Sequence, residues 1–325
     1  MKNALIATIT LNPSLDQHIT VDGLVLDGTN RWSRLHRYAG GKGIDVSRAI
    51  HEMGGRTIAY GFIGGPVGRA VEILLDEEEV PYSFTPIHRE TRTNFIITDS
   101  KTGRQTRIDA PGPHITKDEF ERFQRKMRRI SPNPDLIVVG GSLPPGVPNN
   151  IYYSIIMEAK KFGVRAILDS EGQWLAEGIK AKPYLVKPNV EEAEGLLGHE
   201  LPDEDAIIKG TLDIVDMGVE IAIISRGEEG IIAATENEVI KAVPPQVKVK
   251  SAVGAGDCTI AGLALKLANE ESLFSACRLA VALGTAAALT PGTELARRED
   301  VEELLPQVKV NRITASRLSQ IIAGR

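Results

Sequence analysis

An α/β protein with a mainly parallel central sheet flanked by helices is the fold class that this sequence predicts. From residue 116 onward, short apolar segments alternate with segments of helical periodicity, an order typical of parallel strands joined by right-handed crossover helices. Residues 17–38 and 92–109 instead alternate apolar and polar side chains between turns, which indicates antiparallel strands set apart from the main sheet. We therefore expect a single domain over residues 1–325, with a small second sheet contributed by these two segments.

The composition is typical of a soluble globular protein, with 42% hydrophobic and 25% charged residues. A net charge of −5 gives no long-range attraction to nucleic acid or to an anionic membrane, and no apolar segment approaches membrane-spanning length. Cys258 and Cys277 are too few for a disulfide framework, and the six histidines show no metal-ligand spacing. We expect a cytoplasmic protein that binds neither nucleic acid nor membrane and has no transition-metal site.

The first strand is expected at Leu5–Leu11, which is mostly apolar. A helix over residues 117–130 begins at the capping box formed by Thr116 and Glu119. The other expected strands are 136–139, 164–168, 184–186 and 221–224, and the other expected helices end near Met53 or cover 150–162, 259–267, 272–289 and 299–305.

Polar residues follow several of these strands within a few positions. They are Asp16, Ser142, Asp169, Lys187, Asn189 and Ser225. Packing does not require polar side chains at strand ends, whereas a ligand cleft at the carboxyl edge of an open α/β sheet does. We therefore expect a ligand site at that edge.

Residues 251–258 (Ser-Ala-Val-Gly-Ala-Gly-Asp-Cys) form a glycine-containing turn that leads into an apolar helix. Gly254 and Gly256 permit a tight turn, and the unpaired N–H groups at such a helix N-terminus suit a phosphate. Asp257 has two interpretations at this position. It is either the helix cap or a carboxylate that accepts a hydroxyl proton during phosphoryl transfer.

A second glycine-rich turn, residues 39–45, opens another helix and carries Lys42 between Gly41 and Gly43. It is not a Walker A loop, because a glycine follows the lysine and no glycine stands five positions before Gly41. The alternative to a binding turn is a flexible loop with an exposed lysine.

Four motifs resemble the ribokinase/PfkB carbohydrate kinase family over nearly the whole chain. In order they are Gly-Gly-Lys-Gly (40–43), Gly-Ser-Leu-Pro-Pro-Gly (141–146), Lys-Pro-Asn-x-x-Glu (187–192) and Gly-Ala-Gly-Asp (254–257). Within the family, Thr-Leu-Asn-Pro-Ser-Leu-Asp (10–16) and Thr91-Arg92 are similar to the branch that phosphorylates ketohexose phosphates. The resemblance implies a ribokinase-like three-layer fold, a β-sheet lid over the site, and an ATP-dependent phosphosugar kinase that forms a homodimer through the lid.

The resemblance also implies a role for each matching residue. Asp257 would be the catalytic base, in an anion hole formed with Gly254, Ala255 and Gly256. The phosphosugar would be bound by Asp16, Gly40, Gly41, Lys42, Asp45, Arg92 and Ser142, with Lys42 and Arg92 at its existing phosphate. ATP would be bound by Lys187, Asn189, Ser225, Arg226, Gly227 and Gly230, and Mg²⁺ by Asn189 and Glu192, mostly through water.

Fructose 6-phosphate, converted to fructose 1,6-bisphosphate, is the expected substrate, because Arg107, Pro111-Gly112 and residues 244–249 are similar to the minor bacterial 6-phosphofructokinase. Lys42 favours instead 1-phosphofructokinase or tagatose-6-phosphate kinase. Asp45 replaces an asparagine usual in the family, and its charge would repel a nearby phosphate. A kinase of an unphosphorylated sugar or nucleoside and a non-catalytic sugar-phosphate sensor are less favoured. A dinucleotide oxidoreductase is disfavoured, because the first strand is not followed by its fingerprint.

Overall fold

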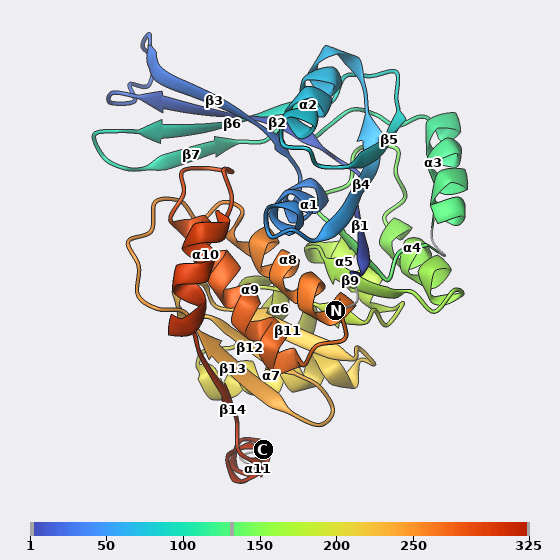
Figure 1. The fold of residues 1–325 in the computed structure, drawn as a ribbon, viewed down its shortest axis with the longest axis vertical. Coiled ribbons are helices and arrows are strands. Elements are labelled where there is room, and N and C mark those ends of the chain that lie inside the picture. The colour runs from blue at the N-terminus through green and yellow to red at the C-terminus, as the bar shows by residue number, and fades with distance from the viewer. Residues whose placement is uncertain (1–2, 131–132, 324–325) are drawn as a thin grey trace.

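Alternate residues of the central strands are buried on opposite faces of a large sheet. In β8 (Leu136–Gly140), Leu136 and Val138 belong to one buried cluster, whereas Ile137 and Val139 belong to another. Strands buried on both faces are typical of parallel sheets covered by helices. The computed structural model describes residues 3–130 and 133–323 and has this architecture, with a second, smaller sheet at one end (Figure 1).

The main sheet has the spatial order β14-β13-β12-β11-β10-β9-β8-β1-β4-β5. In this spatial order, the strands from β11 to β5 are parallel to one another. The other three strands, β12, β13 and β14, each pair antiparallel with their neighbours. The bounds are β1 Leu5–Thr10, β4 Arg56–Ile63, β5 Tyr82–Pro86, β9 Arg165–Asp169, β10 Leu185–Val186, β11 Ile221–Ser225, β12 Ile231–Ala234, β13 Val239–Val243 and β14 Lys309–Arg312. The predicted α/β class with a mainly parallel sheet is confirmed.

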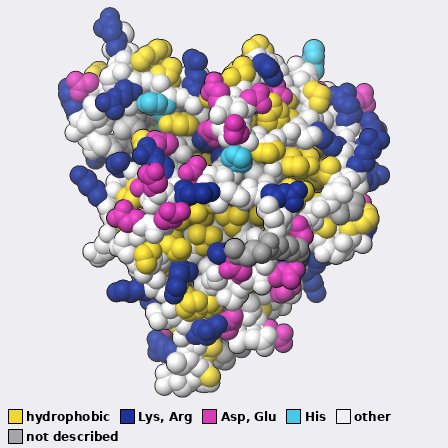
Figure 2. All heavy atoms as spheres, in the orientation of Figure 1, with side chains coloured by type: hydrophobic (Ala, Val, Ile, Leu, Met, Phe, Trp, Pro, Cys, Tyr) yellow, Lys and Arg dark blue, Asp and Glu magenta, His cyan; other side chains and the backbone are white. Residues whose placement is uncertain are grey.

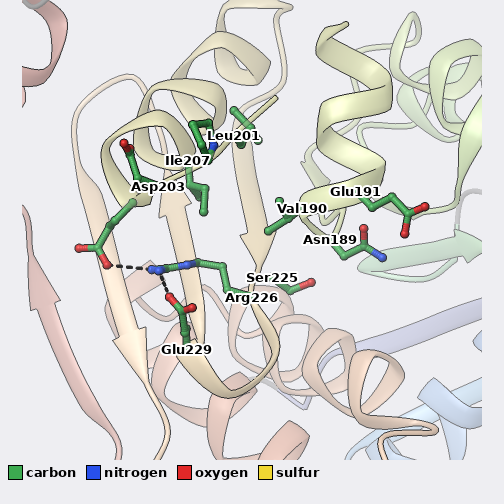
Figure 3. A pocket seen from close by; sticks show the side chains of 11 residues that line it. Asn189, Val190, Glu191, Leu201, Asp203, Ile207, Ser225, Arg226 and Glu229 are labelled. Carbon is green, nitrogen blue, oxygen red and sulfur yellow. Dashed lines mark hydrogen bonds and ion pairs between the residues drawn. The ribbon is translucent and has the colours of Figure 1, made fainter. Parts of the chain in front are cut away.

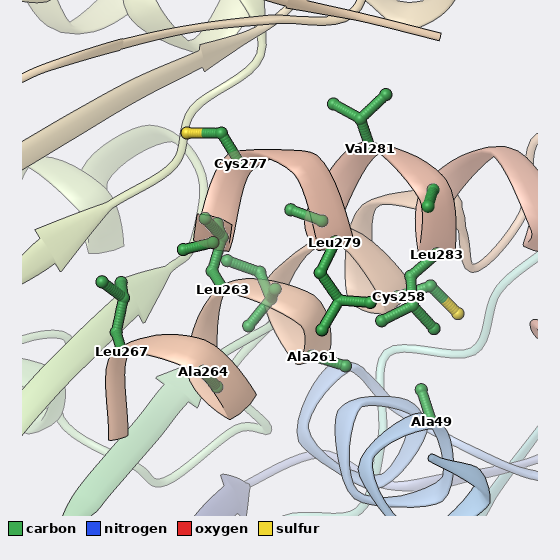
Figure 4. Packing of buried hydrophobic residues seen from close by; sticks show 14 of the residues in the cluster. Ala49, Cys258, Ala261, Leu263, Ala264, Leu267, Cys277, Leu279, Val281 and Leu283 are labelled. Atoms are coloured by element: carbon green, nitrogen blue, oxygen red, sulfur yellow. The ribbon is translucent and has the colours of Figure 1, made fainter. Parts of the chain in front are cut away.

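Helices cover both faces of the main sheet (Figure 1). The bounds are α1 Lys42–Glu52, α2 Gly65–Glu77, α3 Lys117–Ile130, α4 Ile151–Lys160, α5 Gly172–Ile179, α6 Val190–Leu197, α7 Glu204–Asp216, α8 Ala255–Ala268, α9 Leu273–Ala288, α10 Arg298–Leu304 and α11 Ala315–Ala323, with 3₁₀ turns η1 Gly227–Glu229 and η2 Leu305–Gln307. Helices α1, α8 and α9 pack on one face through the cluster drawn in Figure 4, and α3 to α7 pack on the other.

Helix α3 begins as the sequence predicted. Thr116 N and Oγ1 each donate to Glu119 Oε2 at 2.7 Å, and Glu119 N donates back to Thr116 Oγ1 at 3.4 Å. Its lysines and arginines make the densest basic region in Figure 2, at the right of the view, while elsewhere on that face both signs of charge are interspersed.

The small sheet has the order β3-β2-β6-β7, formed by β2 Ser14–Val21, β3 Trp32–Gly40, β6 Arg92–Asp99 and β7 Gln105–Ile108. Strands β2 and β6 pair in parallel, whereas the sequence predicted only antiparallel neighbours. The reason is that β2 follows β1 and β6 follows β5. Both hairpins therefore leave the same edge of the main sheet in the same direction. None of the helices within residues 3–130 and 133–323 has the length and hydropathy of a membrane span.

Candidate active site

The N-terminus of α8 lies at the carboxyl edge of the main sheet and carries Asp257 in its first turn. Gly254 is the N-cap residue, at φ +79°, a left-handed conformation that favours glycine. The N-cap is Gly254, and no side chain of the described residues makes a capping hydrogen bond, so the interpretation of Asp257 as the cap is wrong. The N–H groups of the first turn have no acceptor within the helix. Ala255 N donates to Ala252 O at 3.4 Å, and the N–H groups of Gly256 and Asp257 suit an anion.

Burial raises the pKa of Asp257 to about 6, and the nearby Asp169 adds to this effect. Lys42 and Lys187 oppose the rise by stabilising the carboxylate. A carboxyl group with a pKa close to neutral is suited to accept a proton from a hydroxyl. The Gly-Ala-Gly-Asp turn therefore combines an anion-binding helix end with a competent base.

Asp169, at the end of β9, holds two lysines from different parts of the chain. Lys42 Nζ donates to Asp169 Oδ2 at 2.9 Å, and Lys187 Nζ lies 3.4 Å from Oδ1. The side chains of Asp169 and Lys187 are 3% and 5% exposed, whereas that of Lys42 is 34% exposed. The two lysines outweigh the effect of burial and hold the pKa of Asp169 below its usual value.

The α8 turn adjoins this cluster. A Cβ atom placed on Gly256 would lie 3.8 Å from Lys187 Nζ. Asp257 raises the pKa of Lys42, as Asp169 does more strongly, against the lowering effect of burial. Residues about 40, 170, 190 and 257 along the chain therefore meet at one edge of the sheet, as the sequence predicted.

Asp16 lies on the side of the small sheet that faces this edge. It is a residue of β2 rather than of a loop after β1, and it is 2% exposed. Ser14 Oγ and Asn94 Nδ2 donate to Asp16 Oδ1 at 2.7 and 3.0 Å. A Cβ on Gly40 would lie 2.6 Å from the Asp16 carboxylate, so the first glycine turn packs directly against it.

The second residue of that turn, Gly41, has φ +117° and forms the N-cap of α1. A side chain there would meet Thr10 Cγ2 at 2.6 Å. The turn therefore requires glycine both for its backbone angle and for space.

Arg92 and Ser142 meet at Asn12. Arg92 donates to Asn12 O through Nε and Nη2 at 3.2 and 2.9 Å, and to Ala110 O through Nη1 at 2.7 Å. Asn12 Nδ2 donates to Ser142 Oγ at 3.1 Å, and the buried Asn12 Oδ1 has no hydrogen-bond partner within residues 3–130 and 133–323. Arg92 and Lys42, predicted together at one phosphate, thus contact different residues.

Asp45 is 4% exposed and accepts a hydrogen bond from Arg48 Nη1 at 3.2 Å through Oδ1. Burial and the nearby Asp257 raise the pKa of Asp45 well above its usual value, and Arg48 opposes this. Arg48 also donates to the carboxylate of Glu78 at 2.6 and 2.7 Å. The charge of Asp45 is therefore partly neutralised inside the protein.

Three of the predicted nucleotide residues, Asn189, Ser225 and Arg226, line a pocket of about 490 Å³ beside α6 and α7 (Figure 3). The guanidinium of Arg226 is bound by Glu204, at 2.9 Å, and by Glu229, and its side chain is 7% exposed. Lys187, Gly227 and Gly230 lie outside the lining of this pocket.

Asn189 and Glu192 form the capping box of α6. Asn189 Oδ1 accepts from Glu192 N, and Glu192 Oε2 accepts from Asn189 N, each at 2.8 Å. Across residues 3–130 and 133–323, no group of three His, Cys, Asp or Glu side chains could hold a metal ion by itself. This small donor set fits a Mg²⁺ ion that keeps most of its ligands as water and phosphate oxygens.

Sequence reasoning missed two residues of the site, Asn94 and Arg107, and gave no role to a third. Asn94 fixes Asp16, and Asp169 was predicted at the ligand-binding edge of the sheet without a role there. Arg107 on β7 lowers the pKa of Asp257, although the residue was considered only as a family mark. The alternation along β6 and β7 could have placed Asn94 and Arg107 on the same face as Asp16, had the strand pairing been known.

The chain belongs to the pfkB family of carbohydrate kinases, whose family model matches residues 9–300. These enzymes transfer a phosphoryl group to an alcohol acceptor. Over 309 residues the chain is 34% identical to the 1-phosphofructokinase of Bacillus subtilis, covering 95% of this chain and all of that one. It is 35% identical to the ATP-dependent 6-phosphofructokinase isozyme 2 of Escherichia coli, covering 92% and 97%. It is 34% identical to a tagatose-6-phosphate kinase of Staphylococcus epidermidis, covering 94% and 99%.

Solved structures agree with this assignment. Phosphofructokinase-2 from E. coli in complex with potassium superposes with a TM-score of 0.89 at 34% identity, covering 94% of this chain and 99% of that chain. The tetrameric inhibited form of the same E. coli protein gives 0.87 at 33% identity, covering 94% and 99%. The predicted family and fold class are confirmed.

Proposed function

We propose that the protein is an ATP-dependent phosphosugar kinase that transfers the γ-phosphoryl group of ATP to a hydroxyl of a ketohexose phosphate. The observation that carries this proposal is the placement of Asp257 at an uncapped helix N-terminus beside Lys42, Asp169 and Lys187. Fructose 6-phosphate, giving fructose 1,6-bisphosphate, is the preferred substrate. Fructose 1-phosphate and tagatose 6-phosphate are the alternatives, since relatives named for each of these activities are equally similar.

In this mechanism Asp16 and the Gly40–Gly41 turn orient the sugar, and Arg92 and Ser142 bind its existing phosphate. Asp257 accepts the proton of the acceptor hydroxyl as the oxygen attacks the γ-phosphorus. The N–H groups of the α8 first turn stabilise the charge on the transferring phosphoryl. Mg²⁺ bound near Asn189 and Glu192 would supply further neutralisation of the phosphate charge.

Lys187, Asn189, Ser225, Gly227 and Gly230 form the proposed ATP side of the site. Arg226 contributes here through its backbone, because Glu204 and Glu229 occupy its guanidinium. The small sheet acts as a lid: Ser251 Oγ, just before the α8 turn, donates to Gln105 Oε1 of β7 at 3.3 Å. Exclusion of water by such a lid protects the phosphoryl group from hydrolysis. The cytoplasmic location expected from the sequence stays a prediction.

The experiment that tests this function is a coupled ADP-release screen with ATP and Mg²⁺. We expect the highest kcat/KM with fructose 6-phosphate and lower values with fructose 1-phosphate, tagatose 6-phosphate and unphosphorylated sugars. Calorimetric binding of a phosphosugar without ADP release from any acceptor would instead establish a non-catalytic sensor.

Asp45→Asn is expected to lower the Michaelis constant for the phosphosugar, because asparagine keeps an oxygen for Arg48 but removes the negative charge. The pKa of Asp45 is raised, so at lower pH the carboxyl is neutral and the two side chains differ little. The advantage of the variant should therefore grow as the pH rises, which initial rates at several pH values would measure. An unchanged or increased Michaelis constant at high pH would show that the charge of Asp45 does not repel the phosphosugar.

The outer face of the small sheet supports a homodimer formed through the lid. Strand alternation places Ile19, Leu35, Ile97, Phe95 and Ile108 on the face opposite Asp16. Phe95 and Ile108 are direct cross-strand neighbours, and they are 36% and 53% exposed. A contiguous apolar face of this kind is typical of a protein–protein interface, and a second copy of the chain offers the matching surface.

Phe95→Glu is therefore expected to convert the dimer to a monomer in sedimentation-velocity measurements, because each interface would bury two new carboxylates. Phe162→Glu is the matched control, since Phe162 is 50% exposed and lies just after α4, outside the small sheet. Dimerisation that survives Phe95→Glu, or that is lost equally in both variants, would exclude the lid as the interface.

A further inference from the structure

We propose that Lys42 is a catalytic residue that contacts the transferring phosphoryl group, rather than a ligand of the phosphate that the sugar already carries. The inference rests on the proposed phosphosugar kinase activity and assigns one cation to each of two phosphates. Arg92 binds the resident phosphate, which is the phosphate that the sugar already carries, and Lys42 binds the γ-phosphoryl group of ATP.

The Lys42 side chain extends from the glycine turn toward the ends of β8 and β9. A Cβ on Gly141 would lie 3.6, 3.7 and 3.9 Å from Cβ, Cγ and Cδ of Lys42. The lysine stem therefore passes the end of β8, and its ammonium reaches Asp169 at the end of β9. This direction leads from the sugar-binding turn toward the strands that carry the ATP-side residues.

The charged groups around the Lys42 ammonium indicate which phosphate it contacts. Asp169, Asp257 and Glu192 each raise the pKa of Lys42. Asp257 is the proposed base and Glu192 belongs to the proposed magnesium group, so the ammonium lies among groups that surround a transferring phosphoryl. With 34% of its side chain exposed, Lys42 is also accessible to a bound nucleotide.

Arg92 supplies the cation for the other phosphate. Its guanidinium contacts the backbone oxygens of Asn12 and Ala110, and Asn12 in turn contacts Ser142. A guanidinium has five N–H donors, so three bonds to backbone oxygens leave two donors for a phosphate. No hydrogen bond or ion pair joins Lys42 to Arg92, Asn12 or Ser142 among the described residues.

Asp169 is the positioning residue for Lys42. Its Oδ2 accepts a hydrogen bond from Lys42, whereas its Oδ1 accepts none from the part of the chain that the structure describes. A carboxylate that is 3% exposed and paired with two ammonium groups fixes both lysines near Asp257 of the α8 turn. Lys42 and Lys187 then approach the phosphoryl group from the sugar side and the nucleotide side.

The phosphoryl transfer that Lys42 assists requires only ATP and the phosphosugar as reactants. A bond forms between the acceptor hydroxyl oxygen and the γ-phosphorus, and the bond from that phosphorus to the β–γ bridging oxygen breaks. The hydroxyl proton passes to Asp257, and ADP leaves with the bridging oxygen. Lys42 gains its strongest interaction as charge develops on the phosphoryl oxygens, so its effect falls on the rate rather than on sugar binding.

The test uses Lys42→Met and Lys42→Gln in the full-length protein, with single-turnover rates at saturating substrate and phosphosugar affinity by calorimetry. Lys42→Gln keeps a hydrogen-bond donor for Asp169, so it preserves the fold if the Met variant does not. We expect both to lower the single-turnover rate by about 10²-fold, as the loss of one transition-state donor does, with the phosphosugar dissociation constant within about threefold. Arg92→Met should instead act mainly on phosphosugar affinity, with the dissociation constant raised at least about tenfold. Lys180→Met, at the exposed C-cap of α5, is the control that should change neither quantity.

A dissociation constant raised tenfold or more in the Lys42 variants, with the saturated rate preserved, would return Lys42 to the resident phosphate and overturn the inference. Unchanged values of both quantities would also overturn it. A wild-type protein that releases no ADP with any acceptor contradicts the proposed function itself, and that result is read before the variants are compared.

Discussion

Replacing Asp257 by asparagine is expected to lower kcat by at least about 10²-fold while leaving the affinity for ATP within a few-fold. Asparagine keeps the size of the side chain and removes the ability to accept a proton. Asp257 does not cap α8, so the substitution removes no capping hydrogen bond and should leave the helix start intact. Initial rates together with calorimetric titration of ATP would measure both quantities.

Asp216→Asn is the control for this variant, because Asp216 is an exposed aspartate at the C-terminal end of α7 and has no role in the proposed site. Its kcat should equal that of the wild type. A turnover that is unchanged in Asp257→Asn would eliminate this residue as the base, whatever the geometry around it.

The second large effect concerns stability. Arg48→Leu is expected to lower the free energy of unfolding by about 3–5 kcal/mol, because it leaves a buried carboxylate without its partner. The Arg48 side chain is 5% exposed and donates to Asp45 and Glu78. It also donates to Ala39 O at 3.2 Å and to Thr293 O at 3.0 Å, and so joins α1 to the small sheet and to the loop after α9.

Denaturant titration of Arg48→Leu beside Arg69→Leu would measure this contribution. The side chain of Arg69 is 64% exposed and pairs with Glu72 within one helix, so its loss should change stability by no more than about 0.5 kcal/mol. Equal effects of the two substitutions would show that the Arg48 network contributes no more than a surface pair.

The parts of the site that the sequence predicted are those in which one short segment determines its own conformation. The Gly-Ala-Gly-Asp turn needs a left-handed residue and an uncapped helix, and Gly254 supplies both. The turn at 40–43 likewise needs Gly41 at a positive φ against Thr10. Helix α3 carries its own capping box and was predicted with its observed bounds.

The parts that were not predicted depend on pairing between distant segments. Whether Asn94 lies beside Asp16 depends on the register of β6 against β2, which no local pattern specifies. The antiparallel strands β12, β13 and β14 extend the sheet after the parallel segment. β12 and β13 are short and apolar and β14 is mostly polar, so no local pattern distinguishes the three from connecting segments. The Lys42–Asp169 contact joins residues 127 positions apart.

Asp45 shows most clearly how tertiary packing changes what the sequence alone suggests. From the sequence, its negative charge would repel the phosphate of a phosphosugar substrate. The structure places Arg48 three residues later on the same helix, with Nη1 within 3.2 Å of the carboxylate. The i, i+3 spacing is visible in the sequence, but the burial that makes the pair important follows only from the packing of α1.

The dependence of kcat/KM on pH shows whether Asp257 is the catalytic base. The pKa of Asp257 is raised to about 6, so the carboxylate that accepts the proton is lost as the pH falls through that value. For wild-type protein, kcat/KM should fall about tenfold per pH unit below pH 6 and stay level just above it. The residual activity of Asp257→Asn should lack this acidic limb. An acidic limb that persists unchanged in the variant, or its absence from the wild type, would contradict the assignment of Asp257 as the base.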